Sequence, residues 1–303
     1  MAFHRPAGAV ALAFVLAALS AGMHADAVRR AAPERDALAQ RAQILTGRLE
    51  MAWGDAPPGS GVPYEFSAVL VDDVGVRRPL DVPQALEAAE DLYGLFGRRV
   101  AVSVVPDAVA AKRGATRGRI DAIVPIDDLQ PTRPSGRKVR TTAAGGAEPI
   151  AGVTSWVTLM CKFSDIATEQ KPLSFFQGQY GSAVGQLDHY WQEVSYGQIN
   201  LAGSQAYGWV DLPQPRSFYV TKDANNKDKA DLGLLFTDCV AAHDANVNFA
   251  INGGVQGINM MFNGDLDGYA WGGGRCATLD GINKCWSTTW NPPWSFNNLA
   301  PLS

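Results

Sequence analysis

The stretch LDHYWQEVSYGQINLAGSQAYGWVDLP, residues 187–213, decides the fold class of this chain. Apolar residues just before and inside it share one helical face: Val184, Leu187, Trp191 and Val194. Gly197 stands where a left-handed cap would end the helix. Beyond Gly197, two short apolar runs end at prolines, which indicates strands. A helix that passes directly into strands predicts an α/β layer.

The flanking residues extend this pattern over the C-terminal half. Apolar runs at 153–163 and 258–262 predict buried strands, and 284–290 predicts a last strand. Helical spacing of apolar residues predicts a helix over 229–243. We therefore expect an α/β (α+β) domain over residues 150–303.

Residues 28–129 predict a different, β-rich domain. Strand-like runs occupy 64–71, 76–80, 99–105 and 119–126, with one helix expected over 83–96. This order predicts a small all-β domain, an OB-like barrel or a sandwich, with a pro-region or accessory role. Residues 130–149 are rich in proline and glycine and predict a linker. Basic residues in the linker are compatible with a processing site or with a solvated tether.

The N-terminus predicts export. Arg5 precedes an apolar run over 7–23, and the small residues Ala25 and Ala27 flank Asp26, a pattern typical of signal-peptide cleavage. We expect residues 1–27 to be a signal peptide. A membrane anchor is the alternative, but the run is shorter than the roughly 20 residues that a spanning helix needs. The sequence therefore predicts a secreted protein without a stable membrane span.

Composition excludes one class of partner. The chain has 303 residues, 47% of them hydrophobic, and a formal net charge of −4. Basic residues form neither a stripe nor an amphipathic helix, so the sequence does not predict a nucleic-acid partner.

The four cysteines predict two disulfides. An even number of cysteines in an exported chain favours disulfides over a metal site, although three pairings are possible. Cys276 and Cys285 flank a hairpin-like run, so their pairing needs little loop closure. That pairing leaves Cys161 with Cys239. No C-x-x-C spacing occurs, which argues against a zinc ribbon or a thioredoxin-like site.

Complete catalytic motifs do not occur in the sequence. H-E-x-x-H and G-x-S-x-G are both missing. His189 and Glu193 share one helix face, but that face lies opposite the apolar stripe, so we expect both to be solvated. His243 falls on an apolar helix face, which favours a structural role.

One acidic loop suggests a different metal. Asp265 and Asp267, in the run DLDG, place carboxylates close enough together to hold calcium. The spacing does not match an EF-hand loop, and an ordinary turn explains the two residues equally well.

Four stretches together resemble a known family. They are VTLMCKFSD (157–165), DHYWQEVSYGQINLAGS (188–204), YGWVDLPQPRSFYV (207–220) and INMMFNGDLDGYAWGG (258–273). Over about 150–302 the chain is similar to the immune inhibitor A family of secreted zinc metallopeptidases. The resemblance implies a zincin-like N-terminal half, zinc as cofactor, and a peptide or protein substrate.

The resemblance also implies an order of elements. In the family a strand, a helix, strands, a helix, a strand and an antiparallel edge strand precede the helix that carries H-E-x-x-H. The edge strand then corresponds to Trp286, Ser287, Thr288 and Thr289, which would pair with an extended substrate. The sequence ends where the zinc helix would begin, so no zinc ligand can be carried over. We therefore expect a truncated member that is inactive as given.

Two alternatives remain at this point. The first is a non-catalytic secreted module that binds peptide or glycan through the retained edge strand and the tryptophans Trp271, Trp286, Trp290 and Trp294. The second is a non-functional gene fragment.

Overall fold

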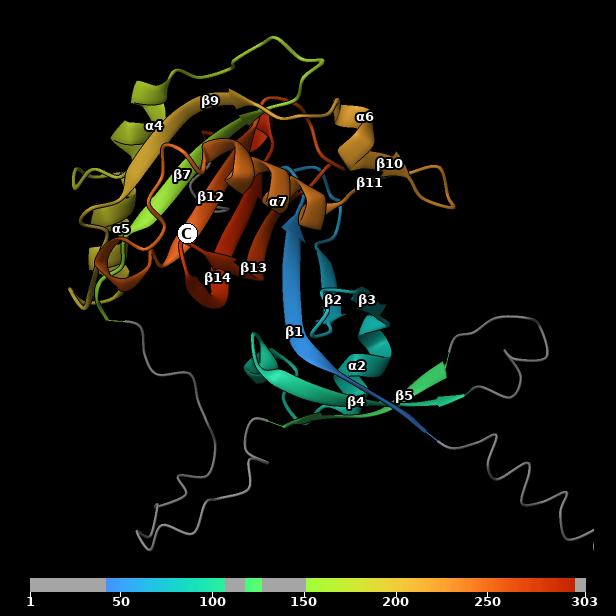
Figure 1. The fold of residues 1–303 in the computed structure, drawn as a ribbon. Coiled ribbons are helices and arrows are strands. Elements are labelled where there is room, and N and C mark those ends of the chain that lie inside the picture. Colours follow the sequence, from blue (N-terminus) through green and yellow to red (C-terminus); the bar gives the residue numbers. More distant parts are fainter. Residues whose placement is uncertain (1–41, 107–117, 127–150, 298–303) are drawn as a thin grey trace, which may run out of the picture. The chain divides into compact units, whose positions relative to one another are not determined.

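The computed structural model describes residues 42–106, 118–126 and 151–297. They form a mixed α/β structure in which strands predominate (Figure 1). The predicted signal peptide and the predicted linker at 130–149 lie outside the described residues. The chain divides into two compact units, and the larger one comprises Thr46–Ala101 and Ile123–Ser303. β4 (Arg99–Pro106) pairs with β5 (Gly118–Pro125), and each of these two strands has residues in both units.

A large sheet organises the larger unit. Its strands follow the order β3-β2-β1-β13-β14-β12-β7-β9. The C-terminal half of the chain contributes β7 (Trp156–Lys162), β9 (Gln205–Asp211), β12 (Gly257–Phe262), β13 (Ala270–Leu279) and β14 (Ile282–Asn291). β9, β7, β12 and β14 are parallel, whereas β13 runs antiparallel to β14. All six residues of β12 are buried, as expected for a central strand with covered faces.

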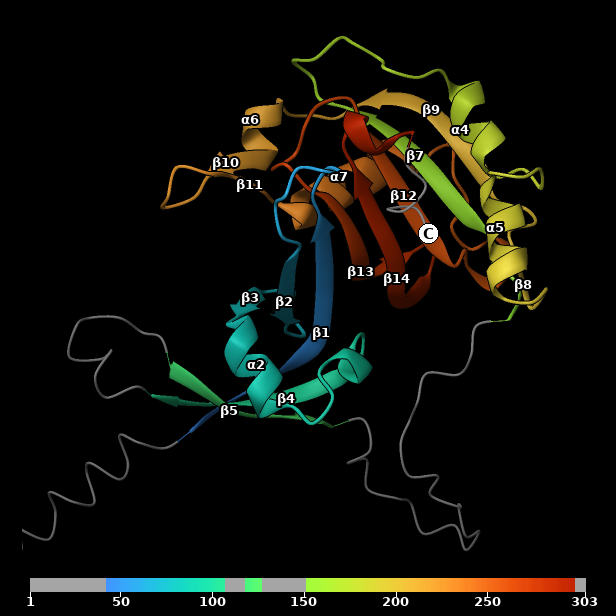
Figure 2. The same ribbon diagram turned by 180° about the vertical axis from the view of Figure 1, so that it is seen from behind.

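Helices cover both faces of these strands. Leu159 of β7 belongs to the same apolar cluster as Leu235 and Val240 of α7 (Leu232–His243). Met160, the next residue of β7, packs with Phe176 of α4 (Leu173–Gln179) and with α5 (Leu187–Val194). Neighbouring strand residues point to opposite faces, so α7 lies on one face and α4 and α5 lie on the other. Figures 1 and 2 show this arrangement from two sides.

Three N-terminal strands join the same sheet. They are β1 (Gln43–Asp55), β2 (Glu65–Val71) and β3 (Arg77–Leu80). β1 pairs antiparallel with β13, with Ala52 opposite Gly273 and Asp55 opposite Ala270. One strand pairing therefore links two segments that the sequence analysis assigned to different domains. A separate OB-like barrel or sandwich over 28–129 stays a prediction.

Shorter elements connect these strands and helices. They are β6 (Gly152–Val153) with β8 (Ile199–Asn200), β10 (Val220–Lys222) with β11 (Asp228–Ala230), α2 (Val82–Ala88), α6 (Arg216–Tyr219), and the 3-10 turns η1 (Tyr93–Leu95), η3 (Ile251–Gly253) and η4 (Pro293–Ser295). The helix predicted over 83–96 is thus wrong in extent. Ala89 is extended and ends α2, and Asp91 accepts a hydrogen bond from the Gly94 amide, which starts a separate turn.

The helix expected near the start of residues 187–213 is present, but its buried face is smaller than predicted. Leu187 is buried, whereas Val184 lies before α5 and Val194 is exposed. Gly197 has φ +75° and follows the end of the helix, as its position in the sequence predicted.

Both predicted disulfides are present. Cys161 of β7 pairs with Cys239 of α7, and Cys276 of β13 pairs with Cys285 of β14. The second bridge joins two residues that lie directly opposite each other in the β13–β14 ladder. Disulfides persist in oxidising compartments, so the two bridges are compatible with an extracellular location.

No helix within the described ranges has the length and apolarity that a membrane span requires.

Candidate functional site

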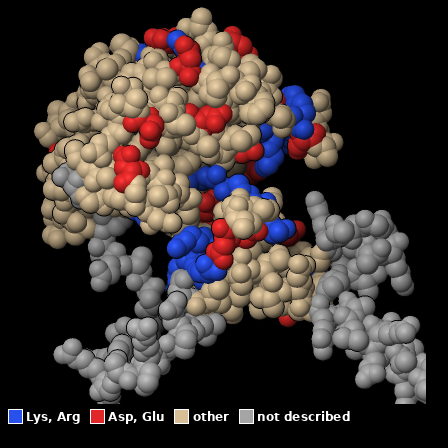
Figure 3. All heavy atoms as spheres, viewed as in Figure 1, with Lys and Arg blue, Asp and Glu red and all other residues tan. Residues whose placement is uncertain are grey.

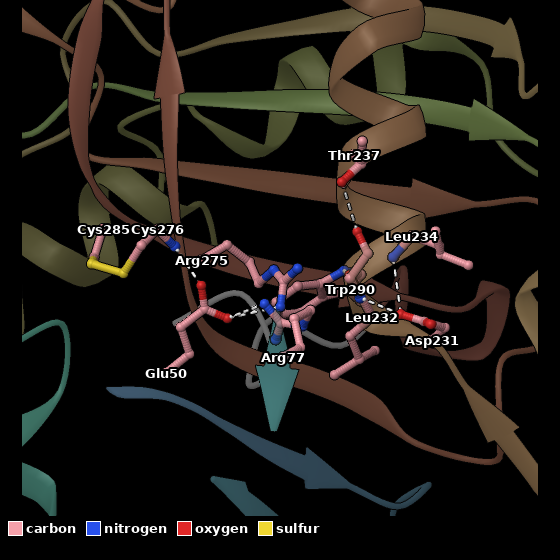
Figure 4. Close-up of polar contacts among 11 residues, drawn as sticks. Glu50, Arg77, Asp231, Leu232, Leu234, Thr237, Arg275, Cys276, Cys285 and Trp290 are labelled. Carbon is pink, nitrogen blue, oxygen red and sulfur yellow. Dashed lines mark hydrogen bonds and ion pairs between the residues drawn. A yellow bond between two sulfur atoms is a disulfide. The ribbon is translucent and has the colours of Figure 1, made fainter. Parts of the chain in front are cut away.

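A buried charge cluster lies where β1 meets β13. The Glu50 side chain is only 3% exposed, and its Oε2 lies 2.7 Å from Nη1 of Arg77 and 2.8 Å from Nη1 of Arg275. Its other oxygen accepts a hydrogen bond of 2.9 Å from the Cys276 amide. Figure 4 shows the carboxylate between this amide and the two guanidinium groups. A buried carboxylate needs such partners, because removing a charge from water is costly.

Three strands position this cluster. Glu50 comes from β1, Arg77 from the first position of β3, and Arg275 from the middle of β13. β1 lies between β2 and β13 in the sheet, and β3 pairs with β2. The cluster therefore forms only when the N-terminal strands are docked on β13.

The first turn of α7 borders the same cluster. The Asp231 side chain caps this helix by accepting hydrogen bonds from the Gly233 and Leu234 amides. A Cβ at position 233 would lie 2.8 Å from Nη2 of Arg275 and 3.4 Å from Nε of Arg77. Glycine at this position therefore lets both guanidinium groups pack against the helix.

Burial affects the charge of Arg275. Removal from water lowers the pKa of Arg275 to about 10, the Glu50 carboxylate opposes this effect, and Arg77 adds to it. Arg275 thus stays protonated at neutral pH. Two guanidinium groups share the Glu50 carboxylate, and the carboxylate of Asp231 adds a second negative charge that acts on Arg275.

The charge cluster forms one wall of a pocket of about 580 Å³. Residues of β1, β2, β3, β11, β13 and the start of α7 line it, and all of them belong to the larger unit. This volume lies within the range of about 300 to 1,000 Å³ that is typical of small-molecule sites. Figure 3 shows basic and acidic side chains in mixed groups on the face that it draws, without an extended basic area.

The predicted substrate strand lies inside the sheet. Trp286, Ser287, Thr288 and Thr289 belong to β14, which pairs with β13 on one side and with β12 on the other. Its backbone hydrogen bonds are therefore directed to neighbouring strands, and β14 offers no free edge to a peptide. The prediction that Trp286, Ser287, Thr288 and Thr289 form an edge strand is therefore wrong. The strand that runs antiparallel after β12, as the resemblance implies for the edge strand, is β13.

The tryptophans predicted as a sugar platform are mostly buried. Trp271, Trp286 and Trp290 are at most 2% exposed. The Trp286 indole donates a hydrogen bond to the Ala277 carbonyl, and the Trp290 indole donates one to the Leu232 carbonyl. These three side chains therefore belong to the core and do not present a surface for stacking sugars.

The predicted calcium residues make different contacts. Asp267 accepts hydrogen bonds from the Ala230 amide and the Trp271 indole, so each of its oxygens has a donor. Asp265 is exposed, and partial burial of its carboxyl group raises its pKa above the usual value. Calcium binding here stays a prediction.

Within the ranges that the structure describes, no three His, Cys, Asp or Glu side chains form a group that could hold a metal ion. All four cysteines are in disulfides. His189 lies at the surface, with Nδ1 3.9 Å from Oε2 of Glu193, whereas His243 is buried with Nε2 3.2 Å from the Met160 carbonyl.

The buried histidine predicts a pH effect on stability. Burial lowers the pKa of His243 below the ordinary 6.5 of histidine, and the hydrogen bond to Met160 only partly offsets this. The unfolded chain therefore takes up this proton before the folded chain does, and the free energy of unfolding should fall as the pH drops below about 6.5. The slope attributable to His243 is at most about 1.4 kcal/mol per pH unit.

Urea denaturation between pH 5 and 7 measures this slope. His243→Gln should flatten it, whereas His189→Gln, which changes a surface histidine, should leave it close to that of the unaltered protein. An unchanged slope in His243→Gln would show that another group causes the pH dependence.

The sequence analysis did not identify Glu50, Arg77 or Arg275. Glu50 interrupts the apolar run LEMAW, and a single charge between buried neighbours is the one local signal that it carries. The two arginines come from segments 27 and 225 residues away from Glu50, and no motif links them.

Comparison of the chain with protein-family models, with curated proteins and with solved structures found no match.

Proposed function

We propose that this chain is an exported, metallopeptidase-like protein that does not hydrolyse peptide bonds by itself. The order of elements along the chain supports this proposal: β7 comes first, then α4 and α5, then β9, α7, β12 and the antiparallel β13. This order agrees, as far as β13, with the one that the resemblance to secreted zinc metallopeptidases implies, although β1 pairs with the outer edge of β13 and a further strand, β14, follows it. The two disulfides are compatible with export.

The lack of activity rests on the residues present. Neither the sequence nor the described residues supply a set of zinc ligands, and H-E-x-x-H does not occur. A zinc ion would polarise the peptide carbonyl and activate water, but we assign no step of that kind to this chain.

The outer edge of β13 supports an accessory role for the N-terminal segment. β1 pairs with β13 from Ala270 to Gly273 and thereby occupies the position at which an extended peptide would add a strand. Glu50 bonds the Cys276 amide further along β13. Peptide binding by strand addition at this edge would require β1 to leave.

Casein hydrolysis tests the proposal. The purified, disulfide-bonded protein should release no peptides from casein beyond a blank, with or without a chelator. The variant His189→Gln controls for zinc held adventitiously by the surface histidine. Cleavage that a chelator abolishes in the unaltered protein would overturn the proposal.

A second candidate is a secreted binding module without catalytic activity. The pocket beside Glu50, Arg77 and Arg275 favours it, because a concave surface with both apolar and charged lining residues is a feature of ligand sites.

A further inference from the structure

The two disulfides differ in their access to solvent. Cys161 and Cys239 are 0% exposed, whereas Cys276 and Cys285 are both partly exposed. Disulfide exchange begins when a thiolate reaches one sulfur of the bridge, so an exposed bridge is reduced more easily than a buried one. A reductant in solution can therefore discriminate between the two bridges.

The strands that the Cys276–Cys285 bridge joins also pair through their backbones. The β13–β14 ladder runs from Trp271, opposite Trp290, to the turn at Asp280 and Gly281. Both turn residues have positive φ, as in the tight turns that join antiparallel strands. The hairpin therefore keeps its own hydrogen bonds when the bridge is open.

One half of the bridge contacts the residues that follow η1. A Cβ at position 97 would lie 3.2 Å from both Cβ and Sγ of Cys285, and this Sγ lies 3.6 Å from the Gly97 carbonyl oxygen. Gly97 has φ +71°, a conformation that glycine adopts without strain. Because position 97 has no side chain, its backbone rests directly on the bridge.

The same residues hold β1. The Gly97 amide donates a hydrogen bond of 2.8 Å to the Leu49 carbonyl, and the Leu49 amide donates one of 3.0 Å to the Arg98 carbonyl. At the other half of the bridge, the Cys276 amide donates a hydrogen bond to Glu50 of β1 (Figure 4). Both halves of the bridge thus adjoin groups that attach β1 to the hairpin.

We propose that the Cys276–Cys285 bridge is a redox switch for the attachment of β1, and that a dithiol opens it in the folded protein. One thiolate of the dithiol attacks a sulfur of the bridge and forms a mixed disulfide. The second thiol then displaces the cysteine, which leaves two protein thiols and the cyclic disulfide of the reductant. Two electrons and two protons pass to the bridge in this exchange.

Reduction changes the space that the two sulfurs need. A disulfide holds them about 2 Å apart, whereas nonbonded heavy atoms stay about 3.5 Å or more apart. At least one sulfur therefore moves, and the surface on which Gly97 rests is no longer fixed. The hold on Leu49 weakens, so β1 leaves the edge of β13 from Ala270 to Gly273 more often and exposes it to extended peptides.

Reduction of the folded protein, followed by alkylation and peptide mass spectrometry, tests which bridge opens. Dithiothreitol is used at a concentration that leaves the far-ultraviolet circular dichroism spectrum unchanged. Cys276 and Cys285 should then be alkylated roughly tenfold faster, or more, than Cys161 and Cys239.

Amide hydrogen exchange in the same samples tests the effect on β1. Peptides that cover residues 46–55 should exchange roughly tenfold faster or more after reduction, whereas peptides from β12, which lies between β14 and β7, should stay protected. The variant Cys276→Ser/Cys285→Ser should show the fast exchange of β1 without dithiothreitol. Adding dithiothreitol to this variant should change nothing further, which controls for reduction of the bridge that it retains.

Four results would overturn the inference. They are no alkylation of the folded protein, alkylation of all four cysteines at the same rate, faster alkylation of Cys161 and Cys239, and opening of the hairpin bridge with unchanged exchange in β1. The inference does not depend on the peptidase proposal, since thiol alkylation and amide exchange are measured separately from casein hydrolysis.

Discussion

Glu50→Gln is expected to lower the free energy of unfolding by about 3 to 5 kcal/mol, the usual cost of removing one partner from a buried ion pair. The Glu50 carboxylate bonds two guanidinium groups and one backbone amide while almost fully buried. The glutamine amide keeps the shape but not the charge, so Arg275 stays buried without its hydrogen-bonded counter-charge, and only the more distant Asp231 opposes its charge. Arg77 is one third exposed and can turn toward water, which places the expected loss near the lower end of the range.

Urea denaturation of matched variants measures this loss. Glu65→Gln is the control, because Glu65 pairs with Lys229 at the surface and such pairs contribute about 0 to 1 kcal/mol. A cost below about 1 kcal/mol for Glu50→Gln would mean that the cluster does not hold β1 on β13.

Removal of the Cys161–Cys239 bridge has the second large expected effect. The bridge joins β7 to α7 across 78 residues, so it restricts the unfolded chain strongly. The chain-entropy model gives a loss of roughly 4.5 kcal/mol for a loop of this size, and roughly 2.5 kcal/mol for the 9-residue separation of Cys276–Cys285. Both Cys161 and Cys239 are fully buried, so their replacement by alanine also leaves unfilled space in the core.

The two double alanine variants, compared in one denaturation series, test this ranking. The variant without Cys161–Cys239 should unfold at the lower urea concentration. The reverse order would mean that the hairpin bridge holds more of the fold together than the bridge between sheet and helix.

Long apolar runs made part of this fold predictable. β7, β12 and α7 lie where the sequence placed them, because buried strands and helices need continuous or periodic apolar residues. The neighbours of β14 could not be predicted in this way. Strand order depends on pairing between distant segments, and the apolar residues of β14 suit an edge strand or an inner strand of a sheet equally well.

The residues of the candidate site were harder to predict from the sequence than the helices and strands. Glu50, Arg77 and Arg275 come together only through the pairing of β1 with β13 and of β3 with β2. Each residue alone looks like an ordinary surface charge. The disulfides could be predicted because four cysteines allow only three sets of pairings. A carboxylate, in contrast, can form an ion pair with any of the chain's basic residues.

Native mass spectrometry tests most directly whether the chain lacks the metal site of the peptidases that it resembles. The disulfide-bonded protein is incubated with a slight excess of zinc, and the buffer is exchanged before the measurement. We predict the mass of the metal-free chain, with the same result for His189→Gln/His243→Gln. One zinc ion per chain that survives buffer exchange, and that enables casein hydrolysis, would contradict the account.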